Sequence, residues 1–147
     1  MNFRLVIDPE KEEEIVATVH SPSPLTDELE QLVRRYSGCD KIIAYTDDDV
    51  ILLSFSDIEC ITVLAGKTYA VDRNGTHHHL KQRLYELEAV LPSNFLRINK
   101  SSIANEDHLV RFTASFSGAV DAVFKCGYKE YVSRRCYAAI KRRFQTR

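Results

Sequence analysis

The sequence lacks the features that mark several large classes of protein. Its 147 residues include no tryptophan, one methionine, five glycines and four prolines, which excludes collagen-like repeats and low-complexity disorder. No apolar run approaches the roughly 18–20 residues that cross a bilayer, and residues 1–4 lack the basic-then-apolar order of a secretory signal. The length suits one domain, or one domain with a small addition. We therefore expect a soluble, compact protein.

Cysteine is sparse, and its spacing excludes the common cysteine-based sites. Cys39, Cys60, Cys126 and Cys136 lie far apart, and no two of them form a C-x-x-C pair. In a chain of this length such cysteines are typical of reduced, mostly buried thiols. The expectation that follows is a cytoplasmic protein, because the cytoplasm keeps thiols reduced.

The motifs of the common enzyme classes are also missing. The sequence has no glycine-rich phosphate loop, no H-E-x-x-H zinc motif and no G-x-S-x-G nucleophile elbow. His77, His78 and His79 cannot all bind one ion from a regular strand or helix, because consecutive side chains point in different directions. The acidic run 47–49 is better explained as a turn than as the acidic pocket of a receiver domain. We predict no enzyme activity, no cofactor, no metal ion and no small-molecule substrate.

Charge is unevenly divided along the chain, although the formal net charge is only −1. Residues 1–49 contain 5 basic and 12 acidic side chains, whereas residues 50–147 contain 15 basic and 9 acidic ones. The basic excess is concentrated in residues 95–147, with 11 basic and 4 acidic side chains. This division indicates two regions with different partners, unless chance alone has scattered the charges.

The acidic front is predicted to be a small module of strand, strand, helix and strand. The expected elements cover residues 3–8, 15–20, 25–36 and 41–46. Alternating apolar residues predict the strands, and apolar residues at helical spacing predict the helix. Either Ser23 or Thr26 can act as the N-cap of this helix, and Ser37 with Gly38 ends it.

The remaining sequence is rich in short strands. Alternation and turn residues predict strands at 50–55, 58–64, 67–72, 76–79, 95–99, 109–113, 120–124 and 128–132. Two helices are expected, at 80–91 before Pro92 and at 133–144. Asn74 and Gly75 form the tip of a hairpin.

Basic side chains gather where these strands end. Three stretches stand out: the hairpin around Lys67 and Arg73, residues 97–102, and residues 133–135. Polar loops between strands would explain any one of them alone. Asn and Lys side chains can contact base edges, however, and Ser can bond to phosphate.

The stretch before the closing helix is the most informative. Ser133 is a good N-cap, and Arg134 and Arg135 follow in the first turn. Cations there oppose the helix dipole at a cost of up to about 1 kcal/mol. An external anion such as a DNA phosphate, held by the helix N-terminus and the guanidinium groups, explains that choice. Arg142 and Arg143, near the end of the helix, are better explained as a solvated face.

Residues 95–105, FLRINKSSIAN, resemble the central signature of the LytTR family of bacterial DNA-binding domains. Phe95, Arg97, Lys100, Ser101 and Asn105 occupy the matching positions. Segments 56–61, 66–69, 84–92 and 131–135 are similar to other parts of the family pattern, in the same order. Asn99 stands where many members have histidine.

The resemblance implies an elongated, mostly antiparallel β fold with short helices, in which loops rather than a recognition helix enter DNA. It makes Lys100 and Arg134 the base-reading residues, placed in two successive major grooves. It makes Arg97, Ser101 and Ser133 supports for the loops or holders of phosphate. The predicted interface also includes Asn99, Arg135 and Arg73.

We therefore predict a LytTR-type domain over residues 48–147, preceded by an α+β module over residues 1–47 that serves dimerisation or partner binding. The expected function is sequence-specific binding of double-stranded DNA by a cytoplasmic transcriptional regulator, as a homodimer. Small members of the family often act with a regulatory membrane protein, which is a further expected partner. The alternative is a protein–protein adaptor whose basic strand ends bind an acidic partner. A single-stranded RNA binder would need exposed aromatics among the basic residues.

Overall fold

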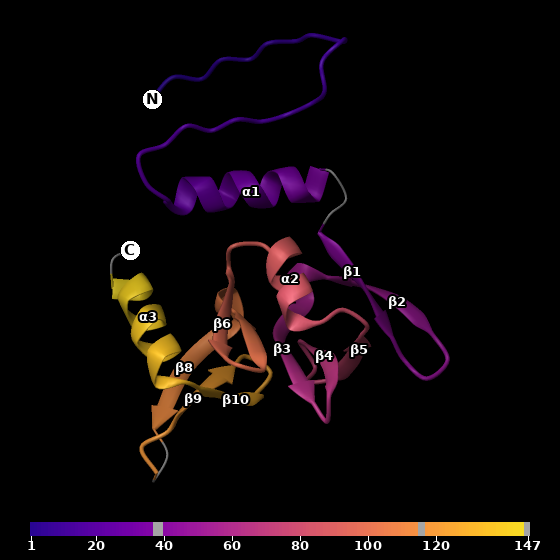
Figure 1. Ribbon diagram of the computed structural model, residues 1–147, viewed down its shortest axis with the longest axis vertical. Helices are drawn as coiled ribbons and strands as arrows, with labels where there is room; N and C mark the ends of the chain where they lie inside the picture. Colours follow the sequence, from indigo (N-terminus) through magenta and orange to yellow (C-terminus); the bar gives the residue numbers. More distant parts are fainter. Residues whose placement is uncertain (37–39, 115–116, 146–147) are drawn as a thin grey trace.

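We describe a computed structural model of the chain, which covers residues 1–36, 40–114 and 117–145 (Figure 1). The described residues form three α-helices: α1 (Pro24–Tyr36), α2 (Leu84–Val90) and α3 (Arg134–Gln145). They also form ten strands: β1 (Lys41–Tyr45), β2 (Val50–Ser54), β3 (Ile58–Leu64), β4 (Lys67–Asp72), β5 (His77–Leu80), β6 (Phe95–Asn99), β7 (Ser102–Asn105), β8 (Leu109–Ala114), β9 (Val120–Phe124) and β10 (Lys129–Val132). None of the helices in this described part is long and apolar enough to span a membrane.

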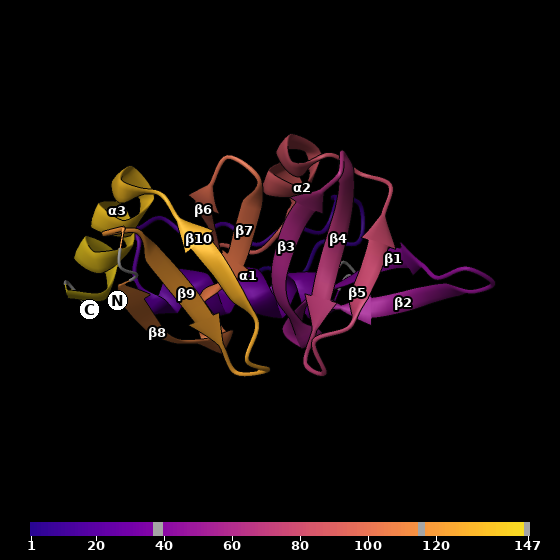
Figure 2. The same cartoon turned by 90° about the horizontal axis from the view of Figure 1, so that it is seen from below.

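The strands form two antiparallel sheets. Seven strands make the larger sheet, in the order β2-β1-β5-β4-β3-β7-β6, and three make the smaller one, in the order β10-β9-β8. The sheets lie next to one another in an elongated molecule, with α3 at one end and the β1–β2 hairpin at the other (Figure 2). The predicted fold class, mostly antiparallel β with short helices, is confirmed.

The structure has two apolar cores. The first core lies between the large sheet and α2, and Ile61, Leu80 and Leu87 are fully buried in it. The second core joins the large sheet to the small sheet and α3, through residues such as Ile98, Phe124 and Ile140. Because β3, β4, β6 and β7 contribute to the second core, the small sheet is fixed against the strands of the large one.

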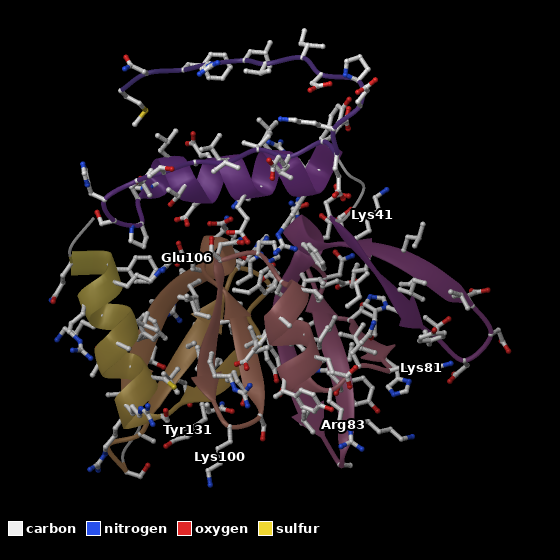
Figure 3. The ribbon with its side chains drawn as sticks, turned by 45° about the horizontal axis from the view of Figure 1, so that its top comes forward. Lys41, Lys81, Arg83, Lys100, Glu106 and Tyr131 are labelled. Carbon is white, nitrogen blue, oxygen red and sulfur yellow. The ribbon has the colours of Figure 1, made fainter. Side chains whose placement is uncertain are left out.

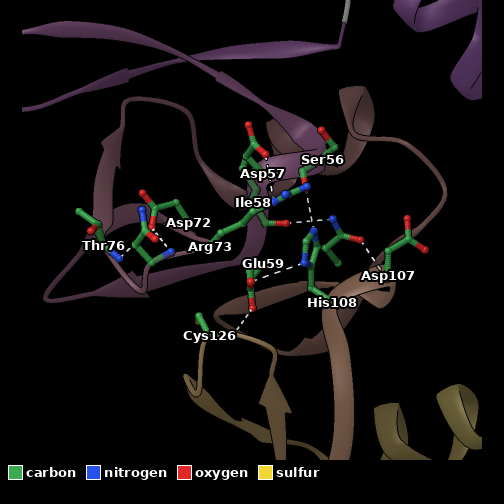
Figure 4. Close-up of polar contacts among 12 residues, drawn as sticks. Ser56, Asp57, Ile58, Glu59, Asp72, Arg73, Thr76, Asp107, His108 and Cys126 are labelled. Carbon is green, nitrogen blue, oxygen red and sulfur yellow. Dashed lines mark hydrogen bonds and ion pairs between the residues drawn. The ribbon is translucent and has the colours of Figure 1, made fainter.

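A buried polar cluster also joins the two sheets (Figure 4). Glu59 on β3 is 1% exposed, and its Oε1 accepts a hydrogen bond of 2.9 Å from the Cys126 backbone N–H. Its Oε2 lies 3.5 Å from Nδ1 of the buried His108. Nε2 of His108 donates to the Ser56 carbonyl at 2.7 Å. Polar side chains buried in this way need such partners, so the cluster specifies how the β9–β10 turn sits on β3.

The N-terminal prediction differs from the structure. Residues 3–8 and 15–20, expected as strands, are exposed and belong to no strand. Alternating apolar residues favour a strand only where another strand supplies the hydrogen bonds. Among the described residues, the hydrogen bonds of this segment are confined to its turn, from Lys11 N–H to the Asp8 carbonyl and from Glu10 N–H to Asp8 Oδ1.

Helix α1 was correctly expected, and both N-cap candidates take part in its start. Pro24 is the first helical residue, so Ser23 occupies the N-cap position. The Thr26 hydroxyl accepts a hydrogen bond of 3.0 Å from the Ser23 N–H and donates one of 2.7 Å to its carbonyl. Ser37, Gly38 and Cys39, which were also assigned from sequence, lie outside the described residues.

Two other boundaries also differ from expectation. Leu80 belongs to β5, where it pairs with Thr68, and α2 begins only at Leu84. The helical spacing of the leucines arises because strand and helix both face the first core. The boundary predicted after residue 47 lies inside the β1–β2 hairpin, in which Tyr45 pairs with Val50, so β1 belongs to the large sheet.

Candidate nucleic-acid interface

Three turns lie along one edge of the molecule: β3–β4, β6–β7 and the junction of β10 with α3. Figure 2 shows them along the upper edge, with the β6–β7 turn between the other two. Two backbone hydrogen bonds connect neighbouring turns. Val63 N–H donates to the Ser101 carbonyl, and Ser133 N–H donates to the Ile98 carbonyl, both at 2.8 Å. The three turns are therefore linked to one another by backbone hydrogen bonds along this edge.

Each turn carries exposed cations. Lys67 follows the β3–β4 turn, Lys100 lies at the β6–β7 turn, and Arg134 and Arg135 open α3. Figure 3 shows Lys100 projecting from this edge of the molecule. Within the described part of the chain, none of the four has an ion-pair or hydrogen-bond partner for its side chain. Their charges are available to an external anion, and we call the edge that carries these four residues the basic edge.

Arg97 holds the β6–β7 turn in shape. Its Nε donates to the Asn99 carbonyl at 2.8 Å, and its Nη2 donates to the Lys100 carbonyl. Its Nη1 lies 2.8 Å from Oε1 of Glu88 on α2. With these three partners, Arg97 positions Lys100 and leaves little of its charge for DNA.

Asn99 ties two turns together. Its side chain is 8% exposed, its Oδ1 accepts a hydrogen bond of 2.7 Å from the Ser101 N–H, and its Nδ2 donates to the Tyr131 carbonyl. Both ends of the amide are used inside the protein. The structure thus places Asn99 beneath the interface as a support, whereas the sequence predicted a DNA contact. The hydroxyl of Ser101, next to Lys100, is exposed on the surface.

The start of α3 follows the prediction closely. The Ser133 Oγ accepts a hydrogen bond of 3.2 Å from the Cys136 N–H, as an N-cap does. Arg134 and Arg135 then lie exposed in the first turn, where the positive end of the helix dipole adds to their charge. The N–H groups and the dipole at such a helix end favour the binding of an anion such as phosphate.

A polar cluster beneath the edge connects three strands. Oγ1 of Thr62 on β3 is 2.9 Å from Oγ of Ser102 on β7 and donates to Oε2 of Glu130 on β10 at 3.2 Å. Tyr128 donates to the same carboxylate oxygen at 2.6 Å. Burial, together with the adjacent carboxylate, raises the pKa of Tyr128, so this phenol stays protonated and keeps donating. The cluster keeps the spacing of the strands, and thus of the turns, fixed.

Arg73 is separated from the other predicted residues. It follows β4 at the end opposite Lys67, and six strand residues span about 20 Å. Its Nε lies 3.1 Å from Oδ1 of Asp57 (Figure 4). The structure therefore brings together seven of the eight predicted site residues. The hairpin does contribute a cation to the edge, but it is Lys67.

The three consecutive histidines do not converge. His78 is buried and its Nε2 lies 2.7 Å from Oδ2 of Asp72, whereas His77 and His79 both pack against Tyr69. Within the described residues, no group of three or more His, Cys, Asp or Glu side chains is arranged to hold a metal ion. Burial also raises the pKa of the Cys60 thiol, which leaves it a poor nucleophile.

Arg83 was missed by the sequence analysis. It precedes α2, is exposed, and lies on the same side of the molecule as Lys100 (Figure 3). The available signal was topological, because the connection from β5 to α2 returns to the edge at which β4 begins. Without a sheet order, nothing in the sequence connects residue 83 with residue 100.

Known proteins resemble this chain in sequence over almost its whole length. The chain aligns with an uncharacterized HTH-type transcriptional regulator of Staphylococcus aureus (strain MSSA476) at 30% identity over 146 residues, which covers 97% of both chains. A counterpart in Staphylococcus aureus (strain MW2) matches with the same identity and coverage. The described helices of the present chain are separated by strands, so no two of them form a helix-turn-helix pair.

A solved structure shares the fold. The LytTr DNA-binding domain of a Bacillus cereus protein superposes with a TM-score of 0.63 at 22% identity, over 70% of this chain and 94% of that one. The family model described as the LytTr DNA-binding domain matches residues 48–145, which include the three turns and their cations. The chain therefore belongs to the LytTr DNA-binding domain family.

Proposed function

We propose that this chain is a transcriptional regulator that binds double-stranded DNA in a sequence-specific manner through the three turns. The observation that carries the proposal is the row of Lys67, Lys100, Arg134 and Arg135 along one edge, all exposed and without partners in the described part of the chain. The family match and the names of the relatives support the same function. Phosphate contacts would supply most of the affinity, and base contacts the specificity.

The order of the turns refines the groove assignment. The β6–β7 turn, which carries Lys100, lies between the β3–β4 turn, which Lys67 follows, and the start of α3, where Arg134 stands (Figure 2). On one face of B-DNA, two successive major grooves are separated by a minor groove. We therefore assign Lys67 and Arg134 to the two major grooves and Lys100 to the minor groove between them. This replaces the sequence-based expectation that Lys100 and Arg134 occupy successive major grooves.

A protein of this kind acts on paired sites when it is a dimer, because operator symmetry mirrors protein symmetry. We propose that the chain functions as a homodimer on two half-sites, each bound by one set of turns. The acidic N-terminal segment, remote from the basic edge in Figure 1, is available for that association.

Binding to duplexes selected from a random pool tests the proposal. Arg134→Ala should weaken the selected duplex by roughly 5- to 150-fold, because a base contact contributes about 1–3 kcal/mol of discrimination. It should weaken a scrambled duplex far less. Arg73→Ala is the matched control, because it also removes an arginine side chain, but from the end of β4 that lies opposite Lys67 and away from the three turns. It should leave both affinities unchanged.

Two other results are informative. Equal weakening of both duplexes by Arg134→Ala would make Arg134 a phosphate contact and remove its base-reading role. If the wild-type protein selects no duplex, DNA binding itself is wrong. The exposed cations would then serve a protein adaptor with an acidic partner.

A further inference from the structure

Helix α1 is docked with its polar side toward the rest of the molecule. Oδ1 of Asp27 accepts a hydrogen bond of 2.9 Å from the Ser93 hydroxyl, and the Arg34 guanidinium donates to the Val90 carbonyl. Leu32 and Val33 are 52% and 38% exposed, and no residue of α1 is buried. An amphipathic helix normally turns its apolar side to the core. The apolar side of α1 is therefore only partly covered in the described structure, with Leu32 and Tyr36 52% and 88% exposed.

The N-terminal arm, defined as residues 1–22, has the same property. Its large apolar side chains are exposed by between 42% (Val19) and 103% (Met1). In Figure 1 the arm runs as two extended segments on the side of α1 that faces away from the sheets. Twelve of the 21 exposed large apolar side chains in the described part of the chain belong to residues 1–36. The exposed large apolar side chains of the described chain are therefore concentrated in the arm and α1.

The exposed apolar area of the arm and α1 is large enough for a stable protein interface. At about 100 Å² of apolar area per side chain, the arm and α1 offer on the order of 1,000 Å² per copy. A stable interface of standard size buries about 800 Å² per partner. The two arm segments also carry backbone N–H and C=O groups that pair with no other strand in the described structure, and such segments readily pair with another chain.

The charge of the arm indicates which kind of partner can bind the apolar side chains of the arm and α1. The arm turn contains Asp8 and four glutamates between residues 10 and 14. This charge repels DNA phosphates and anionic lipid headgroups. A second copy is self-complementary, because antiparallel pairing of two arms places the two acidic turns at opposite ends of the paired segment.

We propose that two copies exchange their N-terminal arms. Each arm pairs along the arm of the other copy and covers the apolar side of that copy's α1. Exchange of an identical element is a common route to dimers. The inference rests on the proposed function, because it supplies the dimer that paired half-sites require, and it names the surface through which that dimer forms.

Sedimentation of the full chain at micromolar concentration tests the association. The wild-type protein should be a dimer, and Ile7→Asp and Leu32→Asp should each raise the dimer dissociation constant at least about 30-fold, as loss of a central contact does. Leu52→Asp is the matched control: Leu52 is 68% exposed on β2, outside the arm and α1, and its replacement should leave the dimer unchanged. A monomeric wild-type protein, or a dimer that survives both arm and helix variants, would overturn the inference.

Disulfide trapping tests the exchange itself. Differently tagged copies carrying Ile7→Cys or Leu32→Cys are mixed and oxidised, with the wild-type protein treated in parallel. The expected product is a disulfide that joins the two tags. A disulfide that forms only within one chain carrying both substitutions would show that the arm covers its own helix, which contradicts the exchange.

The same variants separate this inference from the proposed function. Leu32→Asp should retain the wild-type affinity for a duplex with one half-site, because the basic edge is untouched. Arg134→Ala should remain a dimer. Loss of dimer formation without loss of half-site binding would concern only the arm, and the reverse would concern only the DNA-binding edge.

Discussion

The basic edge and the N-terminal arm lie on opposite sides of the molecule and are held in different ways (Figure 1). Lys100 stands on a turn whose backbone is bonded by Arg97 and Asn99. In the arm, Phe3 and Ile7 are 91% and 85% exposed, and no neighbouring strand supports them. A preorganised turn loses little entropy on binding and so favours discrimination, whereas an unsupported arm must be ordered by its partner.

Deleting residues 1–22 should have the largest effect. The protein should become monomeric, and its affinity for two half-sites on one duplex should fall by about 10²- to 10⁴-fold, the usual gain from linking two binding events. Affinity for one half-site should be unchanged. Titration of both duplexes, with sedimentation of the same samples, measures the difference. A deletion protein that still binds paired sites with wild-type affinity would assign dimerisation to another surface.

Asn99→Ala tests the rigid side of the comparison. The substitution removes the hydrogen bonds to the Ser101 N–H and to the Tyr131 carbonyl, so the free energy of unfolding should fall by about 1–3 kcal/mol, at about 0.5–1.5 kcal/mol for each bond. Discrimination between selected and scrambled duplexes should fall as well, although every exposed cation remains. Urea unfolding and duplex titration provide the two measurements. Unchanged discrimination would mean that the turns need no fixed spacing.

Substitutions of Arg97 and Lys100 should change the salt dependence of DNA affinity to different extents. Lys100→Ala should flatten the slope of log affinity against log salt by about 0.9, because a lysine in the minor groove also neutralises the charge of the phosphates that flank the groove. Arg97→Ala should lower affinity for the selected duplex and change the slope much less, because Glu88 already faces the Arg97 charge. Titration at several salt concentrations separates the two. Equal changes of slope would place Arg97 on the DNA.

Substitution of Asp72, at the turn between β4 and β5, should have the smallest effect on stability and none on DNA binding. Burial acts to raise the pKa of Asp72, but hydrogen bonds from His78, Thr76 and Asn74 outweigh it and lower that pKa. A lowered pKa stabilises the fold above the carboxyl's unfolded value of about 3.9, and this stabilisation is lost as the pH falls through the folded value. Asp72→Asn should therefore be less stable than wild type at pH 7, by on the order of 1 kcal/mol. Unfolding between pH 7 and 2.5 should show the difference shrink, with DNA affinity unaffected at pH 7.

Local sequence patterns predicted most strands and the closing helix of the LytTr domain, since each depends on its own alternation or cap, but they missed β7 (Ser102–Asn105). Ser133 shows the local dependence, because its hydroxyl acts within three residues. The patterns failed where a partner strand decides the structure. Residues 3–8 alternate as a strand does, yet they lie beside no strand that could pair with them.

The predicted site residues also divide into those whose surroundings are local in the sequence and those whose surroundings depend on distant segments. The prediction for Arg134 uses only chemistry that is local to the helix start, and its side chain lies exposed there. Arg73 and Lys67 belong to one hairpin, and only the direction of β4 decides which of them reaches the basic edge. The sequence predicts Asn99 as a DNA contact and gives no sign of its bond to the Tyr131 carbonyl, because that carbonyl lies 32 residues away in the sequence.

The bond from Asn99 to the Tyr131 carbonyl also bears on how the target sequence of such a protein can change. The acceptor is a main-chain atom, so any side chain at position 131 preserves the bond, whereas few side chains at position 99 can replace an amide that both donates and accepts. The side chains of Lys100 and Arg134, the proposed DNA contacts, have no such partner within the described part of the chain, so substitutions there should leave the turns intact. Retargeting the protein by design should therefore randomise positions 67, 100 and 134 and leave Asn99 in place.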